Sequence, residues 1–85
     1  MKYSDTKIEI HSKEESILVQ NILFDEGYKW LSEQKTPQHL DAKYLFIYAN
    51  GNILMSMNDK KHFNNHANKE IFINTVLNQD NYEIY

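Results

Sequence analysis

The chain has 85 residues, a length that allows one domain with one small core. Its composition, with 41% hydrophobic and 25% charged residues, is that of a folded globular protein, and the absence of cysteine excludes disulfides and thiolate metal sites. The formal net charge is −3 and the 9 basic residues are all lysines, which argues against nucleic acid as a partner because no basic field is present.

The first predicted elements are a strand and a helix. Residues 7–11 alternate polar and apolar side chains, the pattern of a strand with one buried face. Ser12 and Glu15 then match a capping box, so a helix is predicted to begin there. Gly27 suits the left-handed conformation that ends a helix, and it gives the helix its C-terminal limit.

A short strand over residues 28–31 follows, with Tyr28 and Trp30 on one face. Residues 32–41 are polar and include the only proline, so they are predicted to form a loop. Residues 43–57 form the clearest element of the sequence, a hairpin that is apolar on both faces.

The hairpin turn at Asn50 and Gly51 is typical of a two-residue type I′ turn, which would pair Ala49 with Asn52. This register places the large side chains on one face: Tyr44, Phe46, Tyr48, Ile53, Met55 and Met57. The smaller side chains fall on the other face, expected beneath the helix: Leu45, Ile47, Leu54 and Ser56.

The end of the chain is less regular. Residues 58–69 are predicted to form a loop with a helical turn around Phe63, and residues 70–73 a last strand. From residue 74 onward the sequence fits a short helix, an edge strand or a loosely attached tail. The fold class is therefore α+β: a single domain over residues 1–85, with an antiparallel or mixed sheet of about four to five strands and one principal helix on one face.

Two sets of apolar side chains are not accounted for by the predicted core between the helix and the sheet. The helix is expected to turn Leu18, Val19, Ile22 and Leu23 toward the sheet, which leaves Ile17 and Phe24 on its opposite side. Either the C-terminal tail covers this pair, or another chain does. The aromatic hairpin face poses the same choice: it forms a second small core under Trp30, Phe63, Phe72 and residues 82–85, or it is an exposed interface.

No catalytic or metal site is predicted. His62, His66 and Glu70 would share one face of a continuous helix, but the asparagines among them disfavour that helix, so no metal and no cofactor is expected. Nucleophile motifs and glycine-rich phosphate loops are missing, which argues against an enzyme. The sequence also lacks an apolar run that would serve as a signal peptide or a membrane span.

The segment Leu23-Phe24-Asp25-Glu26-Gly27-Tyr28-Lys29-Trp30, with the hairpin strand over residues 43–51, resembles small uncharacterised proteins encoded in accessory regions of tailed-phage genomes. In these proteins a strand, a helix ending in Gly-Tyr-x-Trp and an Asn-Gly hairpin recur. The resemblance spans residues 8–73 and implies the same fold and the cytoplasm of a host cell. The abundant Asn, Ile, Lys and Tyr are also typical of an AT-rich genome.

The resemblance further implies a non-enzymatic protein that inhibits a host or defence protein by stoichiometric binding, and a homodimer is one expected form of it. Two alternatives stay open. One is a protein that sequesters a nucleotide or signalling molecule. The other is a single-stranded RNA-binding sheet, because Tyr44, Phe46 and Tyr48 resemble the aromatic strand of such a sheet. The residues expected to bind the partner are these: Tyr44, Phe46, Tyr48, Met55, Met57, Trp30, Ile17 and Phe24.

Overall fold

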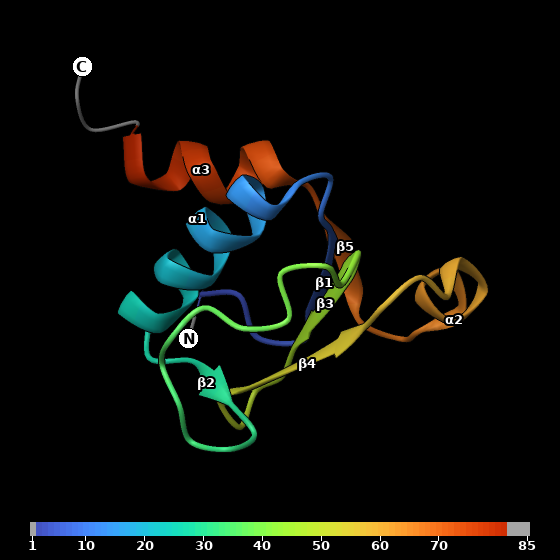
Figure 1. The fold of residues 1–85 in the computed structure, drawn as a ribbon, viewed down its shortest axis with the longest axis horizontal. Coiled ribbons are helices and arrows are strands. Elements are labelled where there is room, and N and C mark those ends of the chain that lie inside the picture. Colours follow the sequence, from blue (N-terminus) through green and yellow to red (C-terminus); the bar gives the residue numbers. More distant parts are fainter. Residues whose placement is uncertain (1, 82–85) are drawn as a thin grey trace.

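A mixed sheet of five strands is the frame of the computed structural model, which describes residues 2–81 and the side chains of residues 2–77 (Figure 1). The strands are β1 (Thr6–Glu9), β2 (Lys29–Trp30), β3 (Tyr44–Ile47), β4 (Asn52–Ser56) and β5 (Lys69–Ile71), in the spatial order β2-β4-β3-β1-β5. β3 is antiparallel to both β1 and β4, whereas β5 is parallel to β1 and β2 is parallel to β4.

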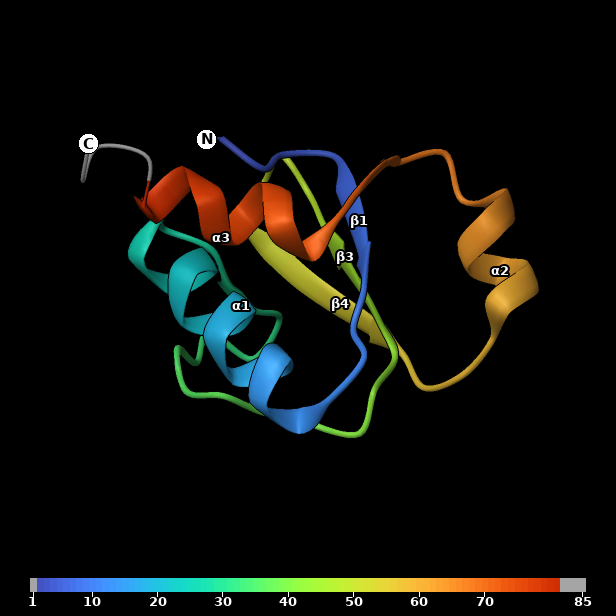
Figure 2. The same ribbon diagram turned by 90° about the horizontal axis from the view of Figure 1, so that it is seen from above.

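Helices cover both faces of this sheet. α1 (Lys13–Asp25) and α3 (Ile73–Asn81) pack against each other on one face, and the short α2 (Lys60–Asn65) lies on the other (Figure 2). The α+β class is therefore confirmed, and α3 joins the single principal helix that the sequence predicts. Residues from 74 onward form most of α3, and Val76 is buried, so they are not a loose tail as far as the described residues extend. Residues 82–85 lie outside the described part.

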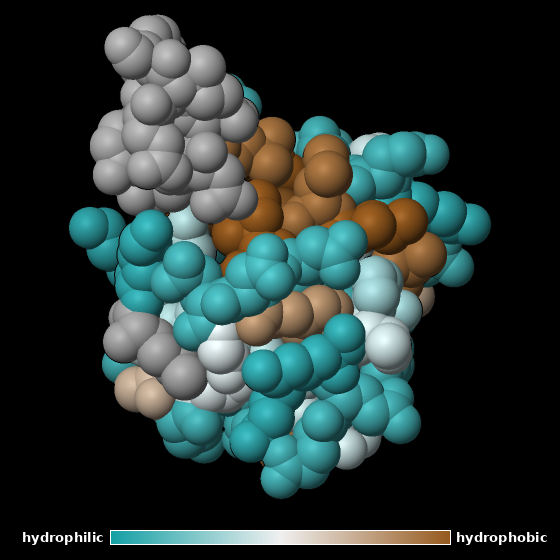
Figure 3. Space-filling view, turned by 90° about the vertical axis from the view of Figure 1, so that its left-hand side faces the viewer, coloured by the Kyte–Doolittle hydropathy of each residue, from teal (hydrophilic) through white to brown (hydrophobic). Residues whose placement is uncertain are grey.

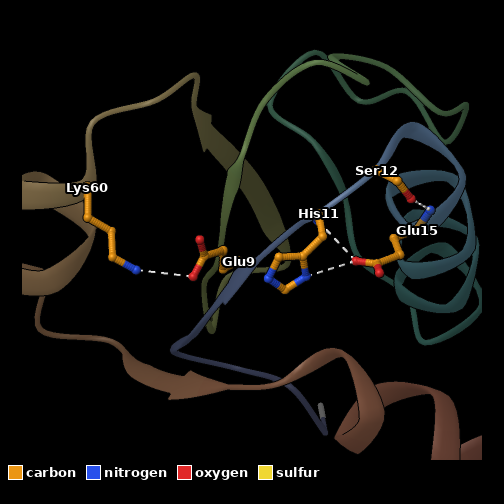
Figure 4. A network of polar contacts seen from close by, with 5 residues as sticks. All are labelled: Glu9, His11, Ser12, Glu15 and Lys60. Atoms are coloured by element: carbon orange, nitrogen blue, oxygen red, sulfur yellow. Dashed lines mark hydrogen bonds and ion pairs between the residues drawn. The ribbon is translucent and has the colours of Figure 1, made fainter.

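The ends of α1 follow from local chemistry. The Ser12 hydroxyl accepts the Glu15 backbone N–H at 3.1 Å, as the capping box predicts (Figure 4). The Glu15 carboxylate accepts the backbone N–H of His11 at 3.0 Å, one residue before the cap. At the other end Gly27 has φ 100°, the left-handed conformation that closes the helix.

The hairpin turn differs from the prediction by one residue. Gly51 alone has positive φ in the turn, its N–H donates to the Tyr48 carbonyl at 2.9 Å, and the Tyr48 N–H donates to the Asn52 carbonyl at 3.0 Å. This is a three-residue type I turn with a glycine bulge, because a type I′ turn would also need positive φ at Asn50.

The shifted register exchanges the faces of β4. Ile47 pairs with Ile53 and Leu45 with Met55, so Ile53 and Met55 join the core beneath the helices, whereas Leu54 lies on the aromatic side. The prediction that Leu54 and Ser56 face the helix was wrong. The buried core between sheet and helices comprises these residues: Tyr3, Ile8, Ile10, Val19, Leu23, Phe24, Tyr28, Trp30, Leu45, Ile47, Ile53 and Val76.

α1 is also rotated relative to the prediction. Val19 and Leu23 face the core as expected, but Leu18 is 51% exposed, while the polar Ser16 and Gln20 are fully buried. α1 has this orientation because it places the Gln20 side chain in the interior next to its hydrogen-bond partners, which are described below. Apolar side chains remain visible where α1 and α3 meet (Figure 3), and the exposed ones on α1 are Ile17 and Leu18.

Candidate functional site

The aromatic face of β3 is covered by α2. Phe63 of α2 is fully buried and stacks on Tyr44, with ring centroids 4.7 Å apart and planes at 26°. Tyr44 and Phe46 are only 3% and 2% exposed. In this conformation the hairpin face is thus a second small core and not an exposed platform. Phe63 makes that core together with Tyr44 and Phe46, while Tyr48 packs half-buried at its margin.

The other predicted partner-binding residues are distributed over the molecule. Trp30 and Phe24 are buried in the main core, because the rotation of α1 turns Phe24 inward and β2 turns Trp30 toward the helix. Met55 is half-buried at the edge of that core, and Met57 and Ile17 are exposed. The structure therefore does not gather the predicted set into one surface. Phe72, expected as a cover, is itself 64% exposed.

Gln20 is a polar residue of the core that the sequence analysis did not single out. Its side-chain oxygen accepts the indole N–H of Trp30 at 3.2 Å and the backbone N–H of Gln38 at 2.8 Å. Its side-chain N–H groups donate to the Gln38 carbonyl at 2.7 Å and to the Ser16 hydroxyl at 2.8 Å. A buried amide thus uses its full hydrogen-bonding capacity, and it fixes the loop between β2 and β3 against the core. The sequence signal was Ser16 and Gln20, four apart on one helix face.

The chain leaves the sheet directly after β2. The Glu33 N–H donates to the Trp30 carbonyl at 2.8 Å, and Glu33 adopts φ 73°, so residues 30–33 form a tight turn. β2 consequently pairs only with Asn52 and Ile53 of β4. Beyond Ile53, no strand among residues 2–81 lies on this side of β4, which leaves an open sheet edge.

A groove of about 480 Å³ lies beside this open edge, and we call it the edge groove. The anchored loop forms one wall: the His39 ring meets the Trp30 ring edge-on at 4.9 Å, and Gln38 is held by Gln20. Leu31, 65% exposed, stands at the rim. The complete lining is Trp30, Leu31, Ser32, Gln38, His39, Ile53, Leu54 and Met55. It is mainly apolar with a few polar groups, a composition that is common in the pockets that bind ligands.

Charged and polar side chains hold α2 on its side of the sheet. The Lys7 ammonium, from β1, donates to the carbonyls of Phe63 and His66, the latter at 3.0 Å, and lies 4.8 Å from the Phe63 ring centroid. Lys60 pairs with Glu9 at 3.1 Å (Figure 4), and this hydrogen bond raises the pKa of Lys60. A cation at the carbonyl end of a helix is favourable, so Lys7 stabilises α2 in place.

His66, which caps the C-terminus of α2, has a hydrogen-bond partner at each ring nitrogen. Nδ1 accepts the backbone N–H of Asn68 at 3.1 Å, and Nε2 lies 2.8 Å from the Tyr48 hydroxyl. The ring packs on Phe46 with centroids 4.5 Å apart. Burial lowers the pKa of His66, and the neighbouring His62 and Lys7 lower it further.

The proposed helical alignment of His62, His66 and Glu70 is absent. α2 ends at Asn65, His66 caps it in an extended conformation, and Glu70 belongs to β5. Within the described residues no group of three or more histidine or acidic side chains could hold a metal ion. These histidines act as packing and hydrogen-bonding groups.

The comparisons with known proteins give no match: no family model, curated protein or solved structure is significantly similar to this chain. Across residues 2–81, the structure also contains no helix whose length and apolar character would suffice for a membrane span. The function is therefore argued from the residues of the site itself.

Proposed function

We propose that this chain is a non-enzymatic binding protein that holds a partner protein stoichiometrically in the edge groove. The observation that carries the proposal is the open edge of β4 beside a groove whose walls are already in place. Preformed grooves bind with a smaller loss of conformational entropy than mobile surfaces. Trp30 and Met55, two of the residues expected from the sequence to bind a partner, line this groove.

The chemistry of the edge favours an extended segment of the partner. An unpaired strand edge presents backbone N–H and C=O groups, which a second strand satisfies by β-augmentation. The open stretch of β4 from Leu54 to Ser56 spans about 10 Å, room for one short strand. One apolar side chain of that strand would enter the groove between Trp30 and Met55, and the side-chain amide of Gln38 and the hydroxyl of Ser32 would select its orientation.

The charge balance supports a protein partner over nucleic acid. The chain carries a net charge of −3 and no arginine. Binding to a nucleic-acid strand, in contrast, depends on contacts between cationic side chains and the phosphates. The resemblance to phage accessory proteins extends the proposal to a host or defence protein as the target and to inhibition as the outcome. A homodimer through the same edge is the competing occupant of the groove.

The test compares two charge substitutions at exposed leucines. Leu31→Glu places a carboxylate at the rim of the edge groove, and Leu18→Glu places one on α1, away from it. The partner is first captured with the wild-type chain from the natural host, and its affinity for each purified variant is then measured by calorimetry. We expect Leu31→Glu to weaken binding at least tenfold and Leu18→Glu to leave it unchanged.

If Leu18→Glu weakens binding and Leu31→Glu does not, the interface lies on the surface of α1 and α3, and the edge groove is refuted as the binding site. Light scattering gives the oligomeric state of the wild-type chain. If the wild type is a dimer and Leu31→Glu is a monomer, the edge groove binds a second copy of the chain. A ratio of absorbance at 260 nm to 280 nm above that of protein alone would instead support the nucleotide-sequestering alternative.

A further inference from the structure

The segment over residues 59–68, which we call the α2 segment, is fastened to the sheet mainly by side chains. Phe63 is buried in the aromatic cluster, and the Lys7 ammonium of β1 donates to the carbonyls of Phe63 and His66. At its end the Asn68 side-chain amide donates to the Thr6 carbonyl at 3.0 Å and to the Ile47 carbonyl at 3.2 Å. Asn68 therefore joins the segment to both β1 and β3, in addition to the contacts of Lys7 and Phe63.

His66 fixes Asn68, and it can do so only as a neutral ring. Because Nδ1 accepts the Asn68 N–H, it carries no proton, and the single ring proton of neutral imidazole is on Nε2. Nε2–H then donates to the Tyr48 hydroxyl oxygen. Proton uptake from solvent would occur at Nδ1, which would place an N–H against the N–H of Asn68 and remove that hydrogen bond.

The surroundings do not compensate for a positive charge on this ring. The basic side chains facing it are Lys7 of β1, which already donates to the His66 carbonyl, and His62 of α2, whose ring centroid is 5.6 Å away. Two carboxylates on this face of the sheet, Glu9 of β1 and Glu70 of β5, both act on Lys60.

We propose that His66 is a pH-sensitive latch: protonation of Nδ1 detaches the α2 segment from β1 and β3 and uncovers Tyr44 and Phe46. The main core beneath α1 and α3 stays folded in this open form, because none of its buried members belongs to the α2 segment. The latch is separate from the edge groove and does not depend on the function proposed for it. It gives the molecule a second, conditional apolar surface.

Hydrogen exchange of the α2 amides in the full chain tests the latch against a variant that cannot titrate. His66→Asn keeps an acceptor near the position of Nδ1 and has no titrating ring. At each pH the ratio of α2 protection in wild type to that in His66→Asn cancels the intrinsic pH dependence of exchange. We expect this ratio to fall by up to about tenfold for each pH unit below about pH 6.5, the ordinary pKa of histidine.

Two further measurements keep the test decisive. Val19 and Leu23 of α1 lie in the main core, so their amide protection should stay constant while the α2 segment opens. His62→Gln should retain the latch and move its midpoint to higher pH, because the neighbouring His62 lowers the pKa of His66. An unchanged ratio would overturn the latch, and so would a loss of α1 protection in step with it. Should His66→Asn not fold, an NMR titration of wild type decides: the Asn68 amide resonance must move with the His66 ring.

Discussion

Gln20 connects the principal helix, the indole of Trp30 and the loop that forms a wall of the edge groove. Each of these contacts replaces a hydrogen bond to water that burial removed. The amide therefore does more than fill space in the core. It decides which side of α1 faces the sheet and where residue 38 of the loop is held.

Replacing Gln20 with leucine should therefore destabilise the protein although leucine is more apolar. The Trp30 indole N–H and the Gln38 N–H would lose their acceptor, and we expect a loss of about 2–4 kcal/mol in the free energy of unfolding. Urea denaturation followed by circular dichroism measures it. Asn21→Leu, at the exposed neighbouring position, serves as the control and should change stability by less than about 0.5 kcal/mol. Equal effects of the two substitutions would refute the role of the amide.

The protonation of His66 has a consequence for global stability as well. Its pKa is lowered in the folded chain, so the unfolded chain binds the proton more readily. The stabilising contribution is fully present above the unfolded value of about 6.5 and is lost as the pH falls through the lowered folded value. Urea denaturation between about pH 8 and pH 5 should show a steeper loss of stability in wild type than in His66→Asn. Parallel profiles would exclude His66 as the source.

At the scale of elements, the hairpin turn determines which side chains of β4 enter the core. Deleting Ala49 would convert the three-residue turn into the two-residue Asn-Gly turn that the sequence favours by itself. The pairing of Tyr48 with Asn52 would be kept, because the deletion removes only a loop residue, and Ile53 and Met55 would stay in the main core.

We expect the Ala49 deletion to preserve the cooperative unfolding transition, because it removes no residue of β3, β4 or the main core. A slip of the register would instead expose Ile53, and losing a fully buried isoleucine alone costs about 2–5 kcal/mol, a large part of the stability of a domain of this size. Gly51→Ala serves as the comparison, since it strains a single left-handed residue and should cost only about 1 kcal/mol. Thermal denaturation of both variants measures the difference. A deletion variant that no longer melts cooperatively, while Gly51→Ala still does, would show that the register depends on the three-residue turn.

Elements governed by neighbouring residues were predictable from the sequence. Ser12 and Gly27 mark the limits of α1, because capping depends on groups within one helical turn. The hairpin register was not predictable, because Asn50-Gly51 suits both a type I′ turn and a type I turn with a bulge, and contacts with β1 and the helices decide between them.

The binding surface was less predictable than the fold. Burial of Gln20 depends on Trp30 and Gln38, which approach it only in the folded chain, and the same rotation of α1 buries Phe24. Phe63 covers Tyr44 and Phe46 because Lys7 and His66 hold α2 on the sheet, and the sequence pattern gives no sign of these contacts. The edge groove itself arises from the early end of β2, a feature of the turn at Glu33.

At the scale of the whole molecule, the sheet has cores of unequal size on its faces. The large core beneath α1 and α3 contains most of the buried apolar residues, and the small one beneath α2 contains Tyr44, Phe46 and Phe63. Regions with few buried contacts open locally at a lower free energy than the rest of a domain.

Native-state hydrogen exchange should therefore separate the molecule into a slow part and a fast part. Central amides of β1 and β3 are expected to exchange only through global unfolding, whereas those of α2 exchange through local opening, at least about a hundredfold faster at neutral pH. A low concentration of urea should accelerate β1 and leave α2 nearly unaffected. Equal protection of both parts would mean that the small core opens only with the large one.

The central place of β1 also affects how the chain is made. Thr6 pairs with Ile47 of β3 and Lys69 of β5, so both neighbours of this strand leave the ribosome long after it does. Until then the strand has nothing to dock on, and the helix that follows it has no sheet to cover. Translation therefore delivers a chain that must complete its fold in one late step, and a nascent chain stalled before residue 69 remains a client for chaperones.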